Sequence, residues 1–368
     1  MMNQELSKAI SLLRFPLMVL LVFYHFDISS IGEVSGNTGV WQIDLPVFPE
    51  SIVAFVSWIG GSLCVPMFFL ISGILFFHNY DGSIQVYSSK IKKRIRSLLI
   101  PYLIWNSLYI VYLIYHHYSH AIPSESLNLS FLSVISQYWD RTLYPLVEID
   151  GVTLVEGAPI YAHFWYIKEL ILLLLLSPAF YYMIKKCFYP SVITLLLLWL
   201  MITDTPNTYQ LLLLGFGGML FLMVGGGISV KGIVLQHVFS SSWWYLPFVI
   251  MSIIDMSFRD TVSSPYIHKV NILFGLIAIM KFAWKFVNSN IHINSALVGS
   301  SFMIYALHAL FISLLITKWC DLVTPYTWYM QLVLWLVVVG SNVLLCVAFD
   351  IITKRFTPYL NRLLTGGR

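Results

Sequence analysis

The chain contains several apolar stretches that are long enough to cross a lipid bilayer, and this feature limits its possible folds most strongly. About 20 apolar residues in a helix span a hydrocarbon core about 30 Å thick. We expect each stretch to be helical, because lipid offers the backbone no hydrogen-bond partners. We place the spans at residues 9–29, 51–78, 95–118, 160–184, 188–203, 209–228, 243–256, 268–287, 299–318 and 328–351. The sequence therefore predicts an all-α integral membrane protein, a bundle of about ten transmembrane helices that forms a single domain over residues 1–368.

The composition argues against a sizeable soluble domain. Hydrophobic residues make up 58% of the chain and charged residues only 10%, whereas a soluble domain carries roughly 25% charged residues. No basic tail or concentrated patch suggests nucleic acid as a partner. The four cysteines form no CxxC pair, so neither a disulfide framework nor a metal site is indicated.

The distribution of Lys and Arg predicts how the chain is oriented. If the N-terminus faces the cytoplasm, Lys168 lies within a span and nearly all other Lys and Arg residues fall on the inner side; the exceptions are Arg141, Arg259, Lys269 and Lys318. Cytoplasmic loops of membrane proteins carry this positive excess. We therefore expect both termini in the cytoplasm and a location in the cell membrane. In the outer loop 119–159, Leu132, Ile135 and Trp139 have helical spacing, which predicts a short interfacial helix.

The first span contains two ionisable residues, Arg14 and His25. Ten residues lie between them, so they are eleven positions apart, which corresponds to about 16 Å along a helix and close to three turns, and they share a face. Ionisable groups inside a membrane are costly and mark functional sites. A His of near-neutral pKa suits the removal of a hydroxyl proton. The alternative is an Arg that reaches the inner interface and a His bonded in the outer one.

A basic run precedes the third span. Lys90, Lys92, Lys93, Arg94 and Arg96 place five cations within seven residues, just before Pro101-Tyr102. Such a run attracts phosphates or anionic headgroups. It is equally compatible with an ordinary cytoplasmic anchor for the helix that follows.

Two further spans carry polar and aromatic side chains. The fourth contains His163, Trp165, Tyr166, Lys168 and Glu169 near its outer end. These residues could contribute to a catalytic site, or form ion pairs and an aromatic interfacial belt. The ninth begins with Ser300 and Ser301, and its Tyr305 and His308 share one face. A buried His in this setting is more often structural than catalytic.

Glycines recur at 215, 217 and 218, at 225–227, and in the dipeptide Ser72-Gly73. No GxxxxGK[ST] motif accompanies them, so they do not form a phosphate-binding loop of that kind. Small residues let membrane helices approach closely, and we expect these glycines to do so.

The ordered set of motifs resembles the acyltransferase-3 family of membrane acyltransferases over nearly the whole chain. The matching segments are Arg14-x10-His25, Val65-Pro-Met-Phe-Phe-Leu-Ile-Ser-Gly73, the basic run leading to Pro101-Tyr102, His163-Phe-Trp165 and Ser301-Phe-Met-Ile-Tyr305-Ala-Leu-His308. The family typically moves an acyl group from cytoplasmic acyl-CoA to a sugar hydroxyl of a surface polysaccharide or its lipid-linked precursor. The resemblance also implies that Arg14 and His25 are essential. The family's arginine pair is replaced here by a mixed Lys/Arg run, so the cation that contacts the donor stays open.

The resemblance implies a site with assigned roles. Acetyl-CoA, or another short acyl-CoA, would dock its phosphates on Lys92, Lys93, Arg94 or Arg96, with Arg14 along the path of its pantetheine arm and no metal. His25 would act as the base on an acceptor hydroxyl, and His163, Tyr166 or Tyr305 would polarise the thioester carbonyl. Remaining candidates for the site are Glu169 in catalysis and Trp165, Tyr305 and His308 in substrate binding.

Two other functions use the same residues. A glycolipid or sugar transporter would use the buried polar groups as a substrate path. A sensing module with this fold would have lost the chemistry, which the presence of Arg14 and His25 opposes. The expected partners are acyl-CoA, a glycan or lipid-linked glycan, and membrane lipids, while homo-oligomerisation stays open.

Overall fold

The computed structural model describes residues 4–26, 46–120, 126–148, 157–202, 215–233, 243, 245–259, 261–287, 293–322 and 327–367. The chain divides into two compact units. The first unit comprises Met1–Phe68 and Ile233–Thr357, and the second comprises Phe69–Gly232 and Pro358–Arg368.

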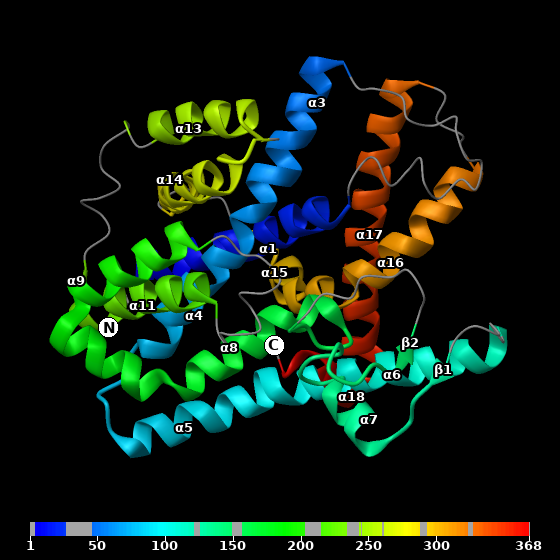
Figure 1. Cartoon of the computed structure of the whole chain (residues 1–368), viewed down its shortest axis with the longest axis horizontal. Coiled ribbons are helices and arrows are strands. Elements are labelled where there is room, and N and C mark those ends of the chain that lie inside the picture. Colours follow the sequence, from blue (N-terminus) through cyan, green and yellow to red (C-terminus); the bar gives the residue numbers. More distant parts are fainter. Residues whose placement is uncertain are drawn as a thin grey trace. The chain divides into compact units, whose positions relative to one another are not determined.

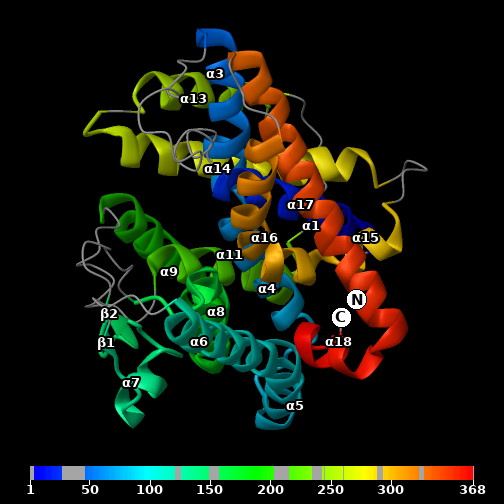
Figure 2. The same cartoon turned by 90° about the vertical axis from the view of Figure 1, so that its right-hand side faces the viewer.

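The first unit is built around the helix α1 (Gln4–His25), which packs against most of its other helices. The helices α16 and α17 lie side by side, and α13 and α14 form a hairpin (Figures 1 and 2). The elements of this unit after α1 are α3 (Val47–Ala54), the π-helix η1 (Phe55–Gly60), the start of α4 (Cys64–Phe77), α13 (Tyr245–Ser257), α14 (Ser264–Lys285), α15 (Ser295–Gly299), α16 (Ser301–Leu322) and α17 (Trp328–Phe356).

The second unit contains the rest of α4 and the helices that follow it. Its two strands, β1 and β2, pair antiparallel with Ser126 opposite Glu148. The other elements are α5 (Ile84–Arg94), the π-helix η2 (Ile95–Leu99), α6 (Ile100–His120), β1 (Ser126–Leu127), α7 (Phe131–Ser136), β2 (Val147–Glu148), the 3-10 helix η3 (Ala162–Phe164), α8 (Trp165–Leu175), α9 (Ser177–Met201), α11 (Phe216–Lys231) and α18 (Pro358–Thr365).

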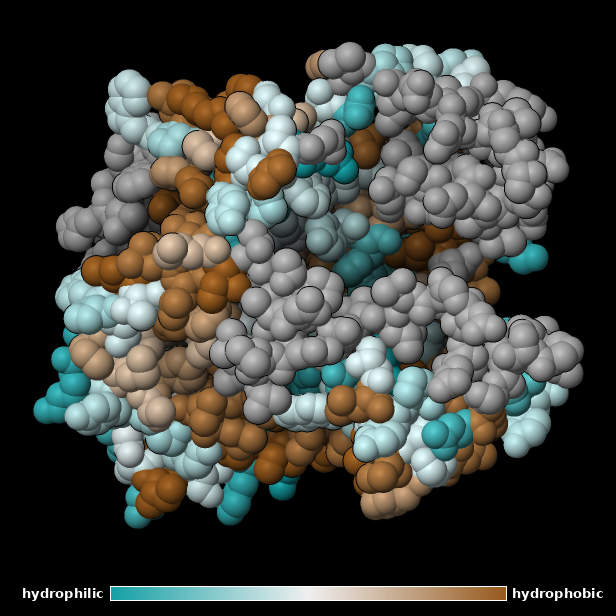
Figure 3. Space-filling view, viewed as in Figure 1, coloured by the Kyte–Doolittle hydropathy of each residue, from teal (hydrophilic) through white to brown (hydrophobic). Residues whose placement is uncertain are grey.

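The prediction of a helical, multi-pass membrane protein is confirmed. Six helical segments are long and apolar enough to cross a membrane, and Phe216–Lys231, Tyr245–Ser257 and Ser301–Ile312 are shorter apolar helices. Large apolar side chains such as Val111, Leu197 and Leu344 are exposed, and apolar residues cover wide areas of the face in Figure 3. A surface of this kind is expected where lipid is the solvent. The count of ten spans and the cytoplasmic termini stay predictions, and the small β1–β2 pair is an exception to the all-α expectation.

One predicted boundary differs from the structure, and one break was not predicted. The third helical segment begins at Ile84 rather than at 95, so the basic run belongs to an extension of the spanning helix. The division expected between residues 184 and 188 is present as a kink in α9, where Cys187 has non-helical dihedrals three residues before Pro190. A second break, which we did not predict, separates α8, which ends at Leu175, from α9, which begins at Ser177 with a proline in its first turn. A proline is well tolerated there because its missing N–H has no helical partner.

The glycine prediction is confirmed in the second unit, where α4 and α11 cross closely. A Cβ on Gly73 would lie 2.2 Å from the carbonyl oxygen of Leu222, and one on Gly225 would lie 2.1 Å from that of Leu70. The Ser229 hydroxyl donates to the Ile74 carbonyl oxygen across the same crossing, at 2.7 Å. The predicted short helix in loop 119–159 is also present, as α7.

Candidate functional site

The first unit places His25 beside His308. The two ring centroids lie 5.2 Å apart, with His25 at the end of α1 and His308 on α16. His308 is fully buried, and its Nδ1 lies 3.0 Å from the Ile304 carbonyl oxygen and 2.8 Å from that of Tyr305. Because carbonyl oxygens only accept, Nδ1 carries a proton, and the neutral ring then has its lone pair on Nε2. This unit therefore contains two imidazoles at the expected reaction end of α1.

The position of His25 is fixed by contacts around the end of α1. The Trp335 indole N–H donates to the carbonyl oxygen of Phe26, at 3.0 Å, and the Asn342 amide donates to that of His308, at 2.8 Å. Tyr305, one turn before His308, keeps its ring centroid 6.4 Å from the His308 ring. The predicted pair Tyr305 and His308 therefore lies close to His25 within the first unit.

Arg14 lies on the same helix, which continues from Gln4 to His25. The separation of about 16 Å expected from helical rise therefore applies. Its side chain is exposed. The distance between Arg14 and His25 follows from their places on one helix, and their roles stay a prediction.

The second unit places Tyr166 against α4. The Tyr166 hydroxyl lies 3.4 Å from the Ser72 hydroxyl, and its ring centroid lies 4.7 Å from that of Phe69. His163 is part of η3 and half-buried, with its ring 5.8 Å from Tyr161. Trp165 is 36% exposed at the start of α8. Tyr166 thus presents a hydroxyl held by α4, and Trp165 an accessible ring.

Glu169 and Lys168 have structural contacts in this unit. The backbone N–H of Gly215 donates to Glu169 Oε1 at 3.0 Å, just before α11 begins, and Glu169 is only 7% exposed. A carboxylate at a helix N-terminus satisfies unpaired N–H groups and interacts favourably with the helix dipole. Lys168 donates to the carbonyl oxygens of Trp139 and Gly157. These contacts favour a capping role for Glu169 over the catalytic role that we expected.

The basic run borders two cavities on α5. A cavity of about 460 Å³ is lined by Leu75, His78, Asn79, Gln85, Val86, Ser89, Lys90 and Lys93. A second, of about 600 Å³, is lined by Ile84, Gln85, Ser88, Ser89, Lys92, Lys93 and Arg96. The two share Gln85, Ser89 and Lys93, which lie on one helical face. They form one polar, cationic surface beside the membrane-spanning helix α6.

The contacts of the run separate its cations. Lys90 Nζ donates to the carbonyl oxygen of His78 at 2.7 Å, just after the end of α4, and therefore supports the α4–α5 turn. In that turn, hydrogen bonds from Ser83 hold the pKa of Asp81 below its usual value. Lys92, Lys93 and Arg96 line the cavities, whereas Arg94 lines neither. Among the predicted donor-binding residues, Lys92, Lys93 and Arg96 are the best placed.

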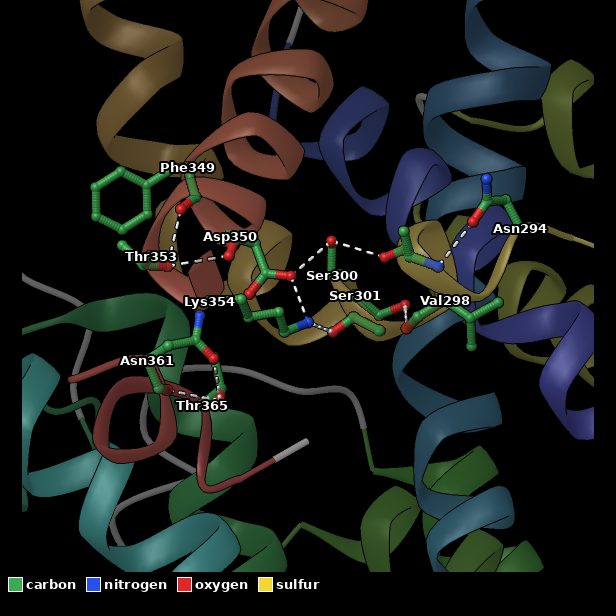
Figure 4. Close-up of polar contacts among 12 residues, drawn as sticks. Asn294, Val298, Ser300, Ser301, Phe349, Asp350, Thr353, Lys354, Asn361 and Thr365 are labelled. Carbon is green, nitrogen blue, oxygen red and sulfur yellow. Dashed lines mark hydrogen bonds and ion pairs between the residues drawn. The ribbon is translucent and has the colours of Figure 1, made fainter. Parts of the chain in front are cut away.

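Figure 4 shows a buried polar cluster that joins α17 to the α15–α16 junction. Asp350 is fully buried, and its Oδ2 accepts from the Ser300 hydroxyl at 2.7 Å and from Lys354 Nζ at 2.6 Å. Lys354 also donates to the carbonyl oxygen of Gly299 at 3.3 Å. These bonds fix the base of α16, the helix that carries Tyr305 and His308.

Sequence reasoning missed one polar cluster in the first unit. Fully buried Asp255 and half-buried His268 form a pair across the α13–α14 hairpin, with Nδ1 2.7 Å from Oδ2. Their signal is visible in the sequence, because both are ionisable residues within predicted spans. The spacing of 13 residues does not predict the contact, because the two residues lie on different helices that only the folded hairpin brings together.

Comparison with known proteins identifies the family of this chain. The family model described as an acyltransferase domain, of the acyltransferase-3 family, matches residues 7–351. The chain is 26% identical over 234 residues to the succinoglycan biosynthesis protein ExoH of Rhizobium meliloti (strain 1021). The matched region covers 62% of this chain and 57% of the length of that relative. No solved structure matches the chain. Because the family model covers nearly the whole sequence, the chain belongs to the acyltransferase-3 family.

Proposed function

We propose that this protein is a membrane O-acyltransferase that uses acyl-CoA, with acetyl-CoA as the first donor to test. The observation that carries the proposal is the pair of cavities on α5 that share Lys93. CoA carries several phosphates, and cations with hydroxyl and amide neighbours provide charge-assisted hydrogen bonds to such groups. Family membership supplies the reaction class.

The acceptor that we propose is a sugar hydroxyl of a surface polysaccharide or its lipid-linked precursor. One relative is named for the biosynthesis of succinoglycan. The acyltransferase reaction needs an acceptor with a nucleophilic oxygen, and glycans are rich in hydroxyl groups. In the proposed topology, the donor enters at the cytoplasmic face of the cell membrane and the acceptor approaches from the other face.

The reaction requires one proton transfer before the acyl group moves. His25 takes the proton from the acceptor hydroxyl, and the oxygen attacks the thioester carbonyl carbon. The carbon–sulfur bond then breaks, and the CoA thiolate takes the proton that His25 holds and leaves as the thiol, which returns His25 to its neutral form. The products are an ester and free CoA. Tyr305, which belongs to the same unit as His25, would stabilise the negative charge that develops on the carbonyl oxygen.

The α5 cavities provide the test of this function. Replacing Lys92, Lys93 and Arg96 with Gln should raise the KM for acetyl-CoA at least tenfold in the purified protein, because the loss of a single charged hydrogen bond costs about 1.5–3 kcal/mol and about 1.4 kcal/mol corresponds to a factor of ten. Lys185→Gln and Lys186→Gln form the matched control, since both side chains are exposed and lie outside the two cavities. The control should keep the wild-type KM.

Two results would count against the proposal. If the wild-type protein consumes no acyl-CoA with any glycan acceptor, the transporter alternative is favoured. If the triple variant inserts normally and binds CoA as the wild type does, the basic run acts only as a cytoplasmic anchor.

A further inference from the structure

The α13–α14 hairpin contains a histidine–carboxylate pair that the proposed reaction does not use. Asp255 is fully buried, and its Oδ2 accepts from His268 Nδ1 at 2.7 Å and from the Asn271 amide at 3.0 Å. The Ser252 hydroxyl in turn donates to the Asn271 carbonyl oxygen at 3.3 Å. An ionised carboxylate only accepts, so the imidazole is held with Nδ1 protonated.

Trp58 lies directly against this pair. The ring centroids of Trp58 and His268 are 4.4 Å apart with the planes tilted by 32°, and the guanidinium carbon of exposed Arg259 lies 5.5 Å from the Trp58 ring. Trp58 belongs to the π-helix η1. Such π-helical turns occur often at functional sites, because they change the direction of a side chain within a helix.

Two atoms of the cluster lack a hydrogen-bond partner among the described residues. They are Trp58 Nε1, a donor, and Asp255 Oδ1, an acceptor, and both are buried. Buried polar groups are nearly always paired, so this donor and this acceptor are available for contacts with a bound molecule. A hydroxyl group both donates and accepts, so hydroxyl groups suit an indole N–H and a carboxylate oxygen alike.

The cluster lies at the end of α1 that carries His25. The Tyr24 and His25 ring centroids are 5.2 Å apart, and a Cβ on Gly61 would lie 2.3 Å from the Cβ of Tyr24. Trp58 is only three residues before Gly61 in the same continuous segment. All of these residues belong to the first unit.

We infer that Trp58 and Asp255 bind a hydroxyl group of the sugar acceptor, with His268 as the residue that positions the carboxylate. The inference rests on the proposed function, in which His25 activates another hydroxyl of the same acceptor. A sugar ring presents several hydroxyls, so one can be held at this cluster while a second reacts.

Binding of simple sugars to the full-length protein in lipid nanodiscs tests the inference. The probes are the methyl pyranosides of glucose, galactose, mannose and rhamnose, observed by saturation-transfer NMR. Trp58→Phe removes the indole N–H but keeps an aromatic ring, and Asp255→Asn removes the charge. We expect each to reduce the saturation transfer of the best probe at least threefold. Trp243→Phe, which changes an exposed tryptophan of the same unit, should leave it unchanged.

Two outcomes would overturn the inference. One is the absence of saturation transfer to all four pyranosides, which would indicate that the cluster binds only water. The other is equal saturation transfer from the wild-type protein and from Trp58→Phe. Because Asp255→Asn can impair folding, thermal unfolding is measured for each variant. If Asp255→Asn is unfolded, the inference is judged from the Trp58→Phe result alone.

Acyl-CoA turnover measured in parallel separates this inference from the proposed function. If Trp58→Phe raises the acceptor KM about tenfold and leaves the KM for acetyl-CoA unchanged, both stand. If pyranosides bind through Trp58 but acyl-CoA is never consumed, the sugar site stands and the acyltransferase assignment fails. If acyl-CoA is consumed normally and no pyranoside binding depends on Trp58, the inference alone fails.

Discussion

His25 and His308 lie beside each other, but their surroundings differ. His308 is fully buried and bonded through Nδ1 to two carbonyl oxygens of its own helix. His25 is exposed at the end of α1. An acceptor hydroxyl can approach an exposed imidazole more readily than a buried one. The contacts therefore favour His25 as the base and His308 as a neighbour that shapes its environment.

We predict that His25→Ala lowers acyl transfer by about 10²–10⁴-fold, the range that a positioned general base contributes. CoA binding should survive, because the proposed phosphate contacts are on α5. The measurements are turnover by the purified, folded variant and calorimetric binding of CoA. His116→Ala, on α6, serves as the control and should keep normal turnover. Near-normal transfer by His25→Ala would remove His25 from the mechanism and direct attention to His163 or His308.

Glu169 provides a second test at the scale of single residues. If it caps α11, Glu169→Gln should keep turnover within about twofold, because a Gln carbonyl oxygen can still accept from the Gly215 N–H. Glu169→Ala should lower stability by about 0.5–2 kcal/mol, as the loss of a cap does. A loss of about 100-fold in turnover for Glu169→Gln, with unchanged thermal unfolding, would instead support the catalytic role.

At the scale of elements, the crossing of α4 and α11 depends on the absence of side chains. Gly225 of α11 faces the backbone carbonyl oxygen of Leu70 in α4, which cannot rotate away as a side chain would. We expect Gly225→Ala to push the two helices apart and to lower stability by about 1–3 kcal/mol. Gly340→Ala, in α17, is the matched control, because nothing lies within 4 Å of its added methyl group. Unfolding in detergent with increasing denaturant compares the two, and equal stability of both variants would contradict the close crossing.

The sequence predicted helices and their faces better than the contacts between them. Long apolar runs identify α1 and α17 because hydropathy alone determines that a segment can span. The break between α8 and α9 was not predicted, because the apolar run continues across it, whereas the division expected between residues 184 and 188 is present as the kink at Cys187. Likewise, the sequence located the cations of the basic run but could not separate Lys90 from Lys93. That distinction depends on the turn that brings His78 to Lys90.

At the scale of the whole molecule, the helix α5 indicates where the membrane boundary lies. The segment Ile84–Ser119 is 36 residues long, about 54 Å at helical rise, and therefore exceeds a hydrocarbon core of about 30 Å. Its first part, α5, has no buried residues and carries the basic run, so this part belongs outside the core. Positive charge marks the cytoplasmic side. Under the proposed function, the α5 cavities would then face the compartment that supplies acyl-CoA.

The same charge distribution predicts that both termini lie on the side of α5. Lys354, Arg355 and Arg362 follow the last spanning helix, and Lys8 and Arg14 lie at the start of the first. Reporter fusions or single cysteines at residues 1–6, 360–368 and 84–88 should all be accessible from the cytoplasm and protected from a membrane-impermeant reagent added outside. A cysteine at Phe131, which is 76% exposed on α7, should show the opposite behaviour. If the two termini lie on opposite sides, the even number of spans is wrong. If both lie outside with α5, the donor site cannot meet cytoplasmic acyl-CoA and the proposed direction of acyl transfer fails.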